Sequence, residues 1–265
     1  MRECNNCTQI WGLHFKKYCL EVSVTVDIHS HILPGVDDGA EDFAEAVDML
    51  RIAAVNGTTD IVLSPHFLTT DMRSSNLDKK ALEARFNNFK SKISEQLPNI
   101  NLYFGAEVFG VSNIEDFLED GEIIPINGNK YVLTEFDFDD SPKRALEITK
   151  ALIGSGYSVV IAHPERYSFV QYEPRLIVPF LEEGAVLQIN AASILGANGP
   201  IAEDVALSFL ENQLAAVVAS DCHSAFYRSP DLSEAYSFVS SQFSPEYADN
   251  LFTFNPLSII NGKRL

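Results

Sequence analysis

Short apolar runs rich in β-branched residues alternate with longer amphipathic stretches along most of the chain. The apolar runs predict strands at residues 23–28, 60–64, 100–104, 131–134, 158–161, 186–189 and 215–219. The intervening stretches repeat apolar residues every three or four positions, which predicts helices at residues 43–55, 77–97, 114–118, 142–153, 174–183, 201–212 and 232–243. A regular succession of strand and helix is typical of an α/β domain with a parallel sheet.

The predicted units follow one another without a linker rich in proline, serine or glycine. We therefore expect a single domain over residues 23–265, in which the parallel sheet is most simply closed into a TIM-like barrel. An open, doubly wound sheet is the alternative. Residues 1–22 lack this patterning and are predicted to be a poorly ordered N-terminal extension.

The chain is strongly acidic, with 37 Asp and Glu residues against 19 Lys and Arg residues and a net charge of −18. This balance argues against a nucleic-acid partner, because phosphate contacts need clustered cations. No run approaches the roughly 18 apolar residues of a membrane span. We also see no secretory signal pattern, so we expect a cytoplasmic protein. An oligomer is possible.

Polar side chains gather where the predicted strands end. Apart from His14, every histidine follows a predicted strand: His29, His31, His66, His163 and His223. Four carboxylates occupy comparable positions: Asp38, Glu107, Glu135 and Asp221. Barrel enzymes build their active sites at the C-terminal ends of the strands, because the βα loops converge there.

Together these nine residues are predicted to be metal ligands. A tetrahedral ion takes about four ligands, so the set suggests on the order of two or three divalent ions that share carboxylates. Imidazoles and carboxylates without thiolates favour manganese, with iron, zinc or magnesium as alternatives. In an extended chain alternate residues point the same way, so His29 and His31 can reach one ion.

Two arginines and one aspartate complete the predicted active site. Arg166 and Arg228 offer planar guanidinium groups that suit phosphate oxygens, so both are predicted to bind phosphate and to act in catalysis. A divalent metal centre would lower the pKa of bound water and supply hydroxide near neutral pH. Asp38 is the candidate proton donor if the leaving group needs one.

Two cysteine patterns suggest other chemistries. The pattern C-x2-C-x6-H-x4-C is similar to a stretched zinc knuckle and comprises Cys4, Cys7, His14 and Cys19. Cys222 and Arg228 read C-x5-R, the spacing of cysteine-dependent tyrosine phosphatases. A loop whose backbone N–H groups cradle phosphate favours glycine, and no glycine lies between these two residues. We therefore interpret Cys222 as a packing residue.

The motifs DIHSHILPGVDDG, SPHF, GAE, LTEF, IAHPERY and ASDCH resemble those of the polymerase-and-histidinol-phosphatase (PHP) family. More narrowly, they resemble its bacterial CpsB/CapC group of metal-dependent protein tyrosine phosphatases. The similarity runs from about Val26 to the end of the chain. It implies a distorted (β/α)7 barrel with a trinuclear metal centre at the C-terminal ends of the strands.

The resemblance also implies a role for each residue. The first metal would be held by His29, His31, Glu107 and Asp221. Glu107 would bridge to a second metal on Glu135 and His163, and the third metal would be held by Asp38, His66 and His223. Arg166 and Arg228 would contact phosphate. The implied substrate is phosphotyrosine, on a bacterial tyrosine kinase tail that controls capsule or exopolysaccharide synthesis.

Three other functions share parts of this pattern. Amidohydrolase-like barrels also open with H-x-H, but many use a carboxylated lysine that the fourth and fifth strand motifs lack. A small-molecule phosphoesterase, such as a histidinol phosphatase, is an alternative. So is a non-catalytic, metal-bound regulatory protein, although a structural metal needs no phosphate-binding arginines.

Overall fold

The structure is a computed structural model that describes residues 24–68 and 78–265. The predicted N-terminal extension, with the cysteine and histidine pattern that resembles a zinc knuckle, lies outside the described residues.

Nine strands form the described sheets, and seven of them correspond to the predicted ones. They are β1 (Thr25–Ser30), β2 (Thr58–Leu63), β3 (His66–Phe67), β4 (Asn101–Phe104), β5 (Glu107–Phe109), β6 (Tyr131–Glu135), β7 (Ser158–Ala162), β8 (Val186–Asn190) and β9 (Ala215–Ala219). Every pairing is parallel, in one sheet of order β1-β2-β4 and another of order β3-β5-β6-β7-β8-β9. The prediction of a parallel α/β fold is confirmed.

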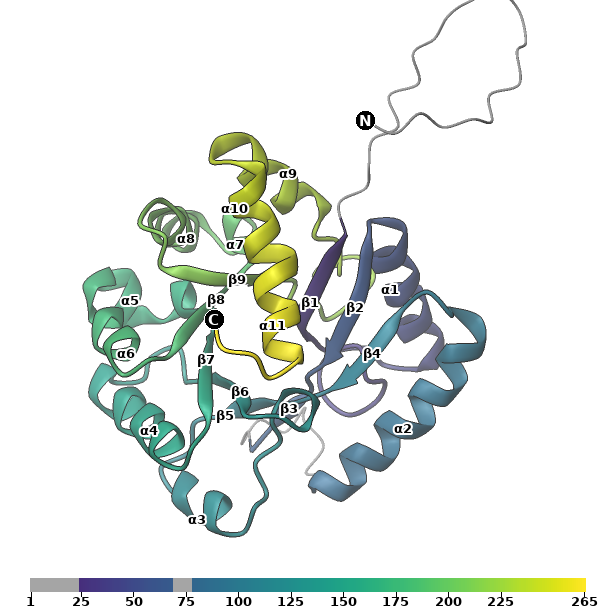
Figure 1. Cartoon of the computed structure of the whole chain (residues 1–265), viewed down its shortest axis with the longest axis horizontal. Coiled ribbons are helices and arrows are strands. Elements are labelled where there is room, and N and C mark those ends of the chain that lie inside the picture. The colour runs from purple at the N-terminus through teal and green to yellow at the C-terminus, as the bar shows by residue number, and fades with distance from the viewer. Residues whose placement is uncertain (1–23, 69–77) are drawn as a thin grey trace, which may run out of the picture.

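The two sheets surround one interior, with the helices outside them (Figure 1). β1 and β9 lie side by side, but the only bridge between them joins Ser30 to Cys222 within the described chain. Two backbone hydrogen bonds reinforce this seam, from Asp221 N to His29 O and from His31 N to Cys222 O, each 2.9 Å long. The wall is therefore a distorted barrel with two breaks in its ladder, one at the seam between β1 and β9 and one at the boundary between the two sheets.

Two site residues lie in short additional strands, β3 and β5. His66 and Glu107 follow β2 and β4, as predicted, but each also begins a short strand of its own, and the two are paired in register. Pro65 cannot donate a backbone hydrogen bond, which interrupts the wall between β2 and β3. Between β4 and β5 the chain turns at Gly105, whose N–H bonds to Leu63 O. β3 and β5 thus extend, at the rim of the barrel, the same sheet that contains β6 to β9.

Helices connect successive strands and cover the outside of the wall (Figure 1). The longer ones are α1 (Phe43–Val55), α2 (Lys79–Gln96), α4 (Pro142–Gly154), α8 (Pro200–Glu211) and α9 (Ser233–Gln242). The shorter ones are α3 (Ile114–Glu119), η1 (Ile126–Gly128), η2 (Pro164–Arg166), α5 (Ser168–Tyr172), η3 (Pro174–Ile177), α6 (Val178–Glu182), α7 (Ala191–Ile194), α10 (Pro245–Asp249), η4 (Asn250–Phe254) and α11 (Asn255–Ile260).

Side-chain caps fix where several of these helices begin. Asp42, Asp78 and Ser141 each accept a hydrogen bond from a backbone N–H in the first turn of α1, α2 and α4. The single helix predicted at residues 174–183 is wrong: the segment is the 3-10 helix η3 followed by α6. Pro179 lacks the N–H that a continuous helix would use there.

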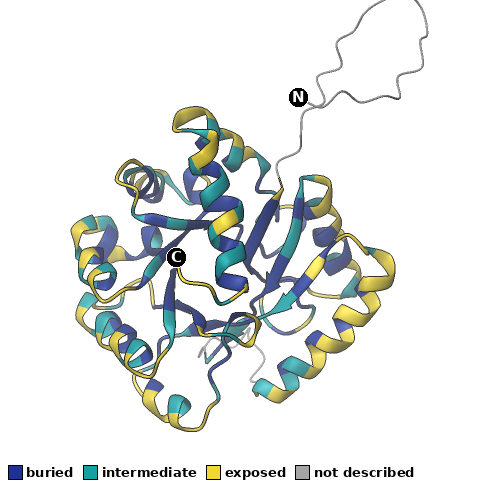
Figure 2. Cartoon of the chain, in the orientation of Figure 1, coloured by how far each residue is buried: buried dark blue, intermediate teal, exposed yellow. Residues whose placement is uncertain are grey.

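The apolar core has two parts. The larger part lies between the strands and the outer helices, which are exposed on their outward faces (Figure 2). The smaller part fills the barrel and includes Val26, Ile28 and Leu133 together with Ile259 and Ile260 of the C-terminal segment.

The C-terminal segment closes the end of the barrel opposite to the loops that follow the strands. Asn129 Nδ2 donates to Ile259 O at 2.8 Å, and Thr253 Oγ1 donates to Val24 O, just before β1, at 2.6 Å. In the view of Figure 1, α11 lies across the middle of the ring of strands. In the described part of the chain, no helix is both long and apolar enough to cross a membrane.

Candidate metal centre

The site begins at the end of β1, where an irregularity in the ladder turns two histidines toward each other. Val26 and Ile28 face the barrel interior, and the register with β2 shifts between Asp27 and Ser30. His29 and His31 are fully buried, and their Nε2 atoms lie 3.2 Å apart. Two ring nitrogens at this separation can both face one cation, as the spacing His-x-His predicts.

The loop after β1 brings two neighbouring aspartates into different positions. Asp37 Oδ2 lies 2.8 Å from His31 Nδ1 and also accepts the backbone N–H of His66 at 3.0 Å. Asp38 points to the other side, with Oδ1 3.4 Å from His66 Nε2 and 3.3 Å from His223 Nε2. Gly39 is required here, because a Cβ atom would lie 1.9 Å from His31 O.

Glu107 of β5 is the carboxylate on which the site converges. Its oxygens lie 3.1 Å from His29 Nε2, 3.4 Å from His31 Nε2, 2.9 Å from His66 Nδ1 and 2.9 Å from His163 Nε2. The side chain is completely buried. A carboxylate surrounded by four imidazoles is well placed to bridge two cations.

All nine predicted ligands are brought together, from loops and strands that are far apart in the sequence. They form four overlapping groups whose ligand atoms lie within 4.8 Å of one another: His31, Asp38, His66 and His223; His29, His163 and Asp221; His29, His31 and Glu107; and His66, Glu107 and Glu135. Because the groups share members, they form one continuous cluster of candidate metal ligands.

Two of these ligands have unusual backbone conformations. His163 and Asp221 lie in the left-handed region, with φ of 32° and 50°. Such conformations cost non-glycine residues about 1–3 kcal/mol, and they concentrate at functional sites. His163 directly follows β7 and Asp221 lies two residues after β9, where the chain must turn sharply to bring the side chain over the barrel mouth.

Both predicted phosphate-binding arginines reach the same carboxylate. Arg166 Nη1 lies 3.2 Å and Arg228 Nη2 lies 2.5 Å from Oδ2 of Asp221. Burial raises the pKa of Asp221, but neighbouring charges from His29 and Arg228 outweigh it and hold that pKa well below the usual value. Both arginine side chains are partly exposed, so part of each guanidinium group remains accessible beside the metal-ligand cluster.

Four buried polar residues belong to the site although the sequence analysis did not select them. Gln188 Oε1 lies 2.8 Å from His29 Nδ1, and its amide donates to Asn190 Oδ1 at 2.8 Å. Asn190 Nδ2 in turn donates to Asp221 Oδ2 at 2.7 Å. Glu165 accepts hydrogen bonds from Asn190 N and Ser193 Oγ. The fourth residue is Asp37, which orients His31.

Gln188, Asn190 and Asp37 contact candidate ligands directly, whereas Glu165 holds Asn190 in place. When Nδ1 of a histidine donates to a fixed acceptor, Nε2 is left as the metal-binding atom. Gln188 and Asp37 can impose this tautomer on His29 and His31. The sequence could have indicated two of the four. Gln188 and Asn190 are polar residues at alternate positions of the otherwise apolar strand β8, so both point to the same side of it.

The donor set fits divalent cations. His66 Nδ1 and Glu107 Oε2 are buried and lack a hydrogen-bond partner, although they lie 2.9 Å from each other. Burial and the charge of His31 lower the pKa of His223 to about 4, so its imidazole is neutral and free to bind a metal. Burying carboxylates and imidazoles that lack full hydrogen bonding costs free energy, and a metal ion bound between them would offset that cost.

Metal-stripped protein should lose stability as the pH rises from about 6.5 to about 9. Burial alone would lower the pKa of His29, but the charges of Glu107 and Asp221 raise it to about 9. A pKa raised on folding gives stability that is complete below the unfolded value and is lost as the pH passes the folded value. The free energy of unfolding, measured with urea, should fall by about 1–3 kcal/mol over this range.

The control for this experiment is the same protein reloaded with metal. A cation bound by His29 would take the place of the proton on its imidazole. The stability of the loaded protein should therefore change much less between these pH values. An equal decrease in stripped and loaded protein would contradict the assignment of His29 to a cation-binding cluster.

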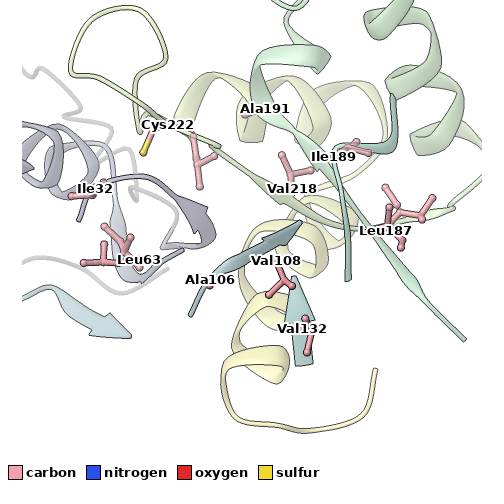
Figure 3. Packing of buried hydrophobic residues seen from close by; sticks show 14 of the residues in the cluster. Ile32, Leu63, Ala106, Val108, Val132, Leu187, Ile189, Ala191, Val218 and Cys222 are labelled. Carbon is pink, nitrogen blue, oxygen red and sulfur yellow. The ribbon is translucent and has the colours of Figure 1, made fainter. Parts of the chain in front are cut away.

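The cysteine-dependent interpretation of Cys222 and Arg228 is not supported by the geometry. Cys222 is fully buried in the larger part of the apolar core, on the side of Ile32 and Leu63 (Figure 3). Burial, with the charge of Asp27, raises the pKa of its thiol well above the usual value. A nucleophilic cysteine needs the opposite shift and access to the substrate.

Four of the five backbone N–H groups between Cys222 and Arg228 are already hydrogen-bonded within the loop. The N–H groups of His223 and Ser224 donate to Arg228 O, and those of Phe226 and Tyr227 donate to Ser224 Oγ. A phosphate cradle would need these N–H groups. Cys222 is therefore a packing residue, as interpreted from the sequence.

Comparison with known proteins places the chain in a family. The model of the capsular polysaccharide synthesis family CpsB/CapC matches residues 25–261. The chain belongs to this family. It is 33% identical to the tyrosine-protein phosphatase YwqE of Bacillus subtilis, over 83% of this chain and 86% of that protein. It is 35% identical to the putative tyrosine-protein phosphatase CapC of Staphylococcus aureus, over 75% and 77%.

Solved structures of CpsB/CapC members share the fold. The chain matches a structure from a study of B. subtilis YwqE and Streptococcus pneumoniae CpsB, described as unique metal-dependent tyrosine phosphatases. The TM-score is 0.83 at 29% identity, and the match covers 91% of this chain and 96% of that one. The phosphotriesterase homology protein of Escherichia coli, with a TM-score of 0.59 at 11% identity, shares the fold alone. The predicted family and fold class are confirmed.

Proposed function

We propose that this chain is a divalent-metal-dependent protein tyrosine phosphatase whose active site is the nine-ligand cluster with Arg166 and Arg228. The observation that carries the proposal is the convergence of both guanidinium groups on Asp221, a member of that cluster. Cations and arginines at one place suit a doubly charged phosphate monoester. The CpsB/CapC relatives named above as tyrosine phosphatases support the choice of substrate.

We assign the nine predicted ligands to a centre of two or three ions, with manganese as the first candidate. His29, His31, Glu107 and Asp221 would hold one ion. His66 lies between the other groups, since Nδ1 faces Glu107 and Glu135 while Nε2 faces Asp38. When bound, divalent ions supply Lewis acidity, which activates water as a nucleophile and offsets phosphate charge.

The side chains of this chain supply binding, orientation and charge. Arg166 and Arg228 would hold phosphate oxygens and stabilise the negative charge that develops on them. Gln188, Asn190 and Asp37 keep the histidines and Asp221 in the geometry that this requires.

Asp38 suits a ligand role better than the predicted role of proton donor. Hydrogen bonds from His223 and His66 hold its pKa far below the usual value, so the carboxyl group is ionised. A tyrosine phenolate, with a pKa of about 10, needs less protonation as a leaving group than an alkoxide does. A tyrosine phosphatase can therefore function without a strong general acid at this position.

Phosphate release from a phosphotyrosine peptide should depend on metal and not on Cys222. We expect stripping with a chelator to abolish release, Mn²⁺ to restore it, and Cys222→Ser to retain most of it. Activity that survives stripping but is lost in Cys222→Ser would contradict the proposal. If the protein hydrolysed histidinol phosphate and not the peptide, it would still be a metal-dependent phosphatase, but its substrate would be a small phosphoester rather than phosphotyrosine.

The proposal extends to the partner and the location. We expect the substrate to be the tyrosine-rich tail of a bacterial kinase in the cytoplasm. The role in capsule or exopolysaccharide synthesis fits the name of the family, capsular polysaccharide synthesis.

A further inference from the structure

Phe138 is an exposed aromatic side chain beside the polar centre. It lies in the loop after β6, three residues beyond the ligand Glu135, and 42% of its surface is exposed. The centre of its ring is 4.5 Å from the guanidinium carbon of Arg166 and 6.0 Å from the ring of His163. A single exposed aromatic ring is common on protein surfaces, so it is the position of Phe138 against Arg166 that relates it to the site.

The loop that carries Phe138 is held in place by hydrogen bonds. Phe138 O accepts from Ser168 N at 2.7 Å, and Ser168 Oγ donates to Asp139 Oδ1 at 2.6 Å. At the start of the loop, Phe136 N donates to the buried hydroxyl of Tyr167. The ring of Phe138 is therefore positioned before any substrate arrives, which reduces the entropy lost on binding.

Because Phe138 packs on Arg166, its ring would lie beside a phosphate group bound to that arginine. The ring lies over the guanidinium group of Arg166, and Nη1 at its edge reaches Asp221. Phosphate oxygens bind to the edges of a guanidinium group, in its plane. The organic group of an ester held there can consequently lie against the exposed part of the Phe138 ring.

We propose that Phe138 is a specificity-determining residue that contacts the aromatic ring of aryl phosphate esters such as phosphotyrosine. This inference rests on the proposed function, because it assumes that phosphate binds at Arg166. A second aromatic ring can pack on Phe138 in an edge-to-face or offset arrangement, whereas a short alkyl group covers less of its surface.

Phe138 could instead only support Arg166. The two roles differ in what they predict. Loss of a support weakens every phosphate ligand equally, because each uses the same guanidinium group. Loss of a ring contact weakens aryl ligands selectively and leaves alkyl ligands nearly unchanged.

The test uses inhibition by two phosphonates that the enzyme cannot hydrolyse, on full-length metal-loaded protein. For Phe138→Ala we expect the inhibition constant of phenylphosphonate to rise about tenfold and that of ethylphosphonate to rise less than about twofold. Phe138→Tyr keeps the ring and should restore binding of phenylphosphonate. The metal content of each variant, measured by elemental analysis, should stay unchanged.

Phe254→Ala is the matched control, because Phe254 is also exposed but lies at the opposite end of the barrel, in η4. It should alter neither inhibition constant. Equal weakening of both phosphonates in Phe138→Ala, or no weakening of either, would overturn the specificity role. Failure of the proposed function would look different, since unsubstituted metal-loaded protein would then not hydrolyse phosphotyrosine or phenyl phosphate at all.

Discussion

Replacing Glu107 with alanine should remove most of the bound metal and lower kcat/KM for a phosphotyrosine peptide by about a thousandfold or more. The carboxylate contacts four imidazoles from three parts of the fold, at the ends of β1 and β7 and in β3, so its removal leaves His29, His66 and His163 without their common negative partner. Without this carboxylate, the site would offer a cation too little negative charge to offset the hydration that the cation loses on binding. Metal content by elemental analysis and peptide turnover would together check this expectation.

The matched controls separate charge from shape. Glu107→Gln keeps the volume of the side chain but removes its charge, and it should lose metal nearly as completely as the alanine variant. Glu211→Ala removes an exposed carboxylate at the end of α8 and should behave as the unsubstituted protein. Full metal content in Glu107→Gln would show that Glu107 is not a ligand.

Replacing Arg166 with alanine should leave the metal content intact and lower kcat/KM by about a hundredfold. The side chain is not one of the nine ligands, and it meets the cluster only through Asp221 Oδ2. Asp221 would keep its contacts with Arg228 and Asn190, so the ligand geometry should survive. The loss should therefore fall on phosphate binding and on stabilisation of charge in the transition state.

Arg166→Lys gives the corresponding control for charge. A lysine keeps the positive charge but lacks the planar group that can bond two oxygens and stack on Phe138, so it should recover only part of the activity. Arg228→Ala should resemble Arg166→Ala, since both groups converge on the same oxygen. Unchanged kcat/KM in Arg166→Ala would show that this arginine does not bind phosphate.

Much of the fold could be predicted because the barrel strands are short, apolar and regularly spaced. The segments missed by the prediction are those without such a pattern. β3 and β5 have two and three residues, too few for any periodicity to be visible. The last helix, α11, carries Ile259 and Ile260, which pack inside the barrel rather than on its outside, so its pattern alone does not reveal its place.

The convergence of the nine candidate ligands could be predicted from the sequence, but the details of their arrangement could not. Histidines and carboxylates after successive strands imply a shared edge, and the structure brings all nine together. The sequence could not distinguish the neighbours Asp37 and Asp38, because only the turn at Gly39 decides which carboxylate faces which histidine. It also could not show that Gln188 and Asn190 point to His29 and Asp221, since register with β9 and β7 sets their direction.

The C-terminal segment that closes the barrel has a consequence for how the protein is made. Ile259 and Ile260 complete an interior that begins with Val26 and Ile28 of the first strand, so the earliest and latest segments of the chain share one core. A ribosome adds about 5–20 residues per second, and the barrel remains open at one end until the last helix has emerged. Newly synthesised chains are therefore exposed to proteases and to self-association for most of translation, and loss of even the final ten residues should prevent accumulation in the cell.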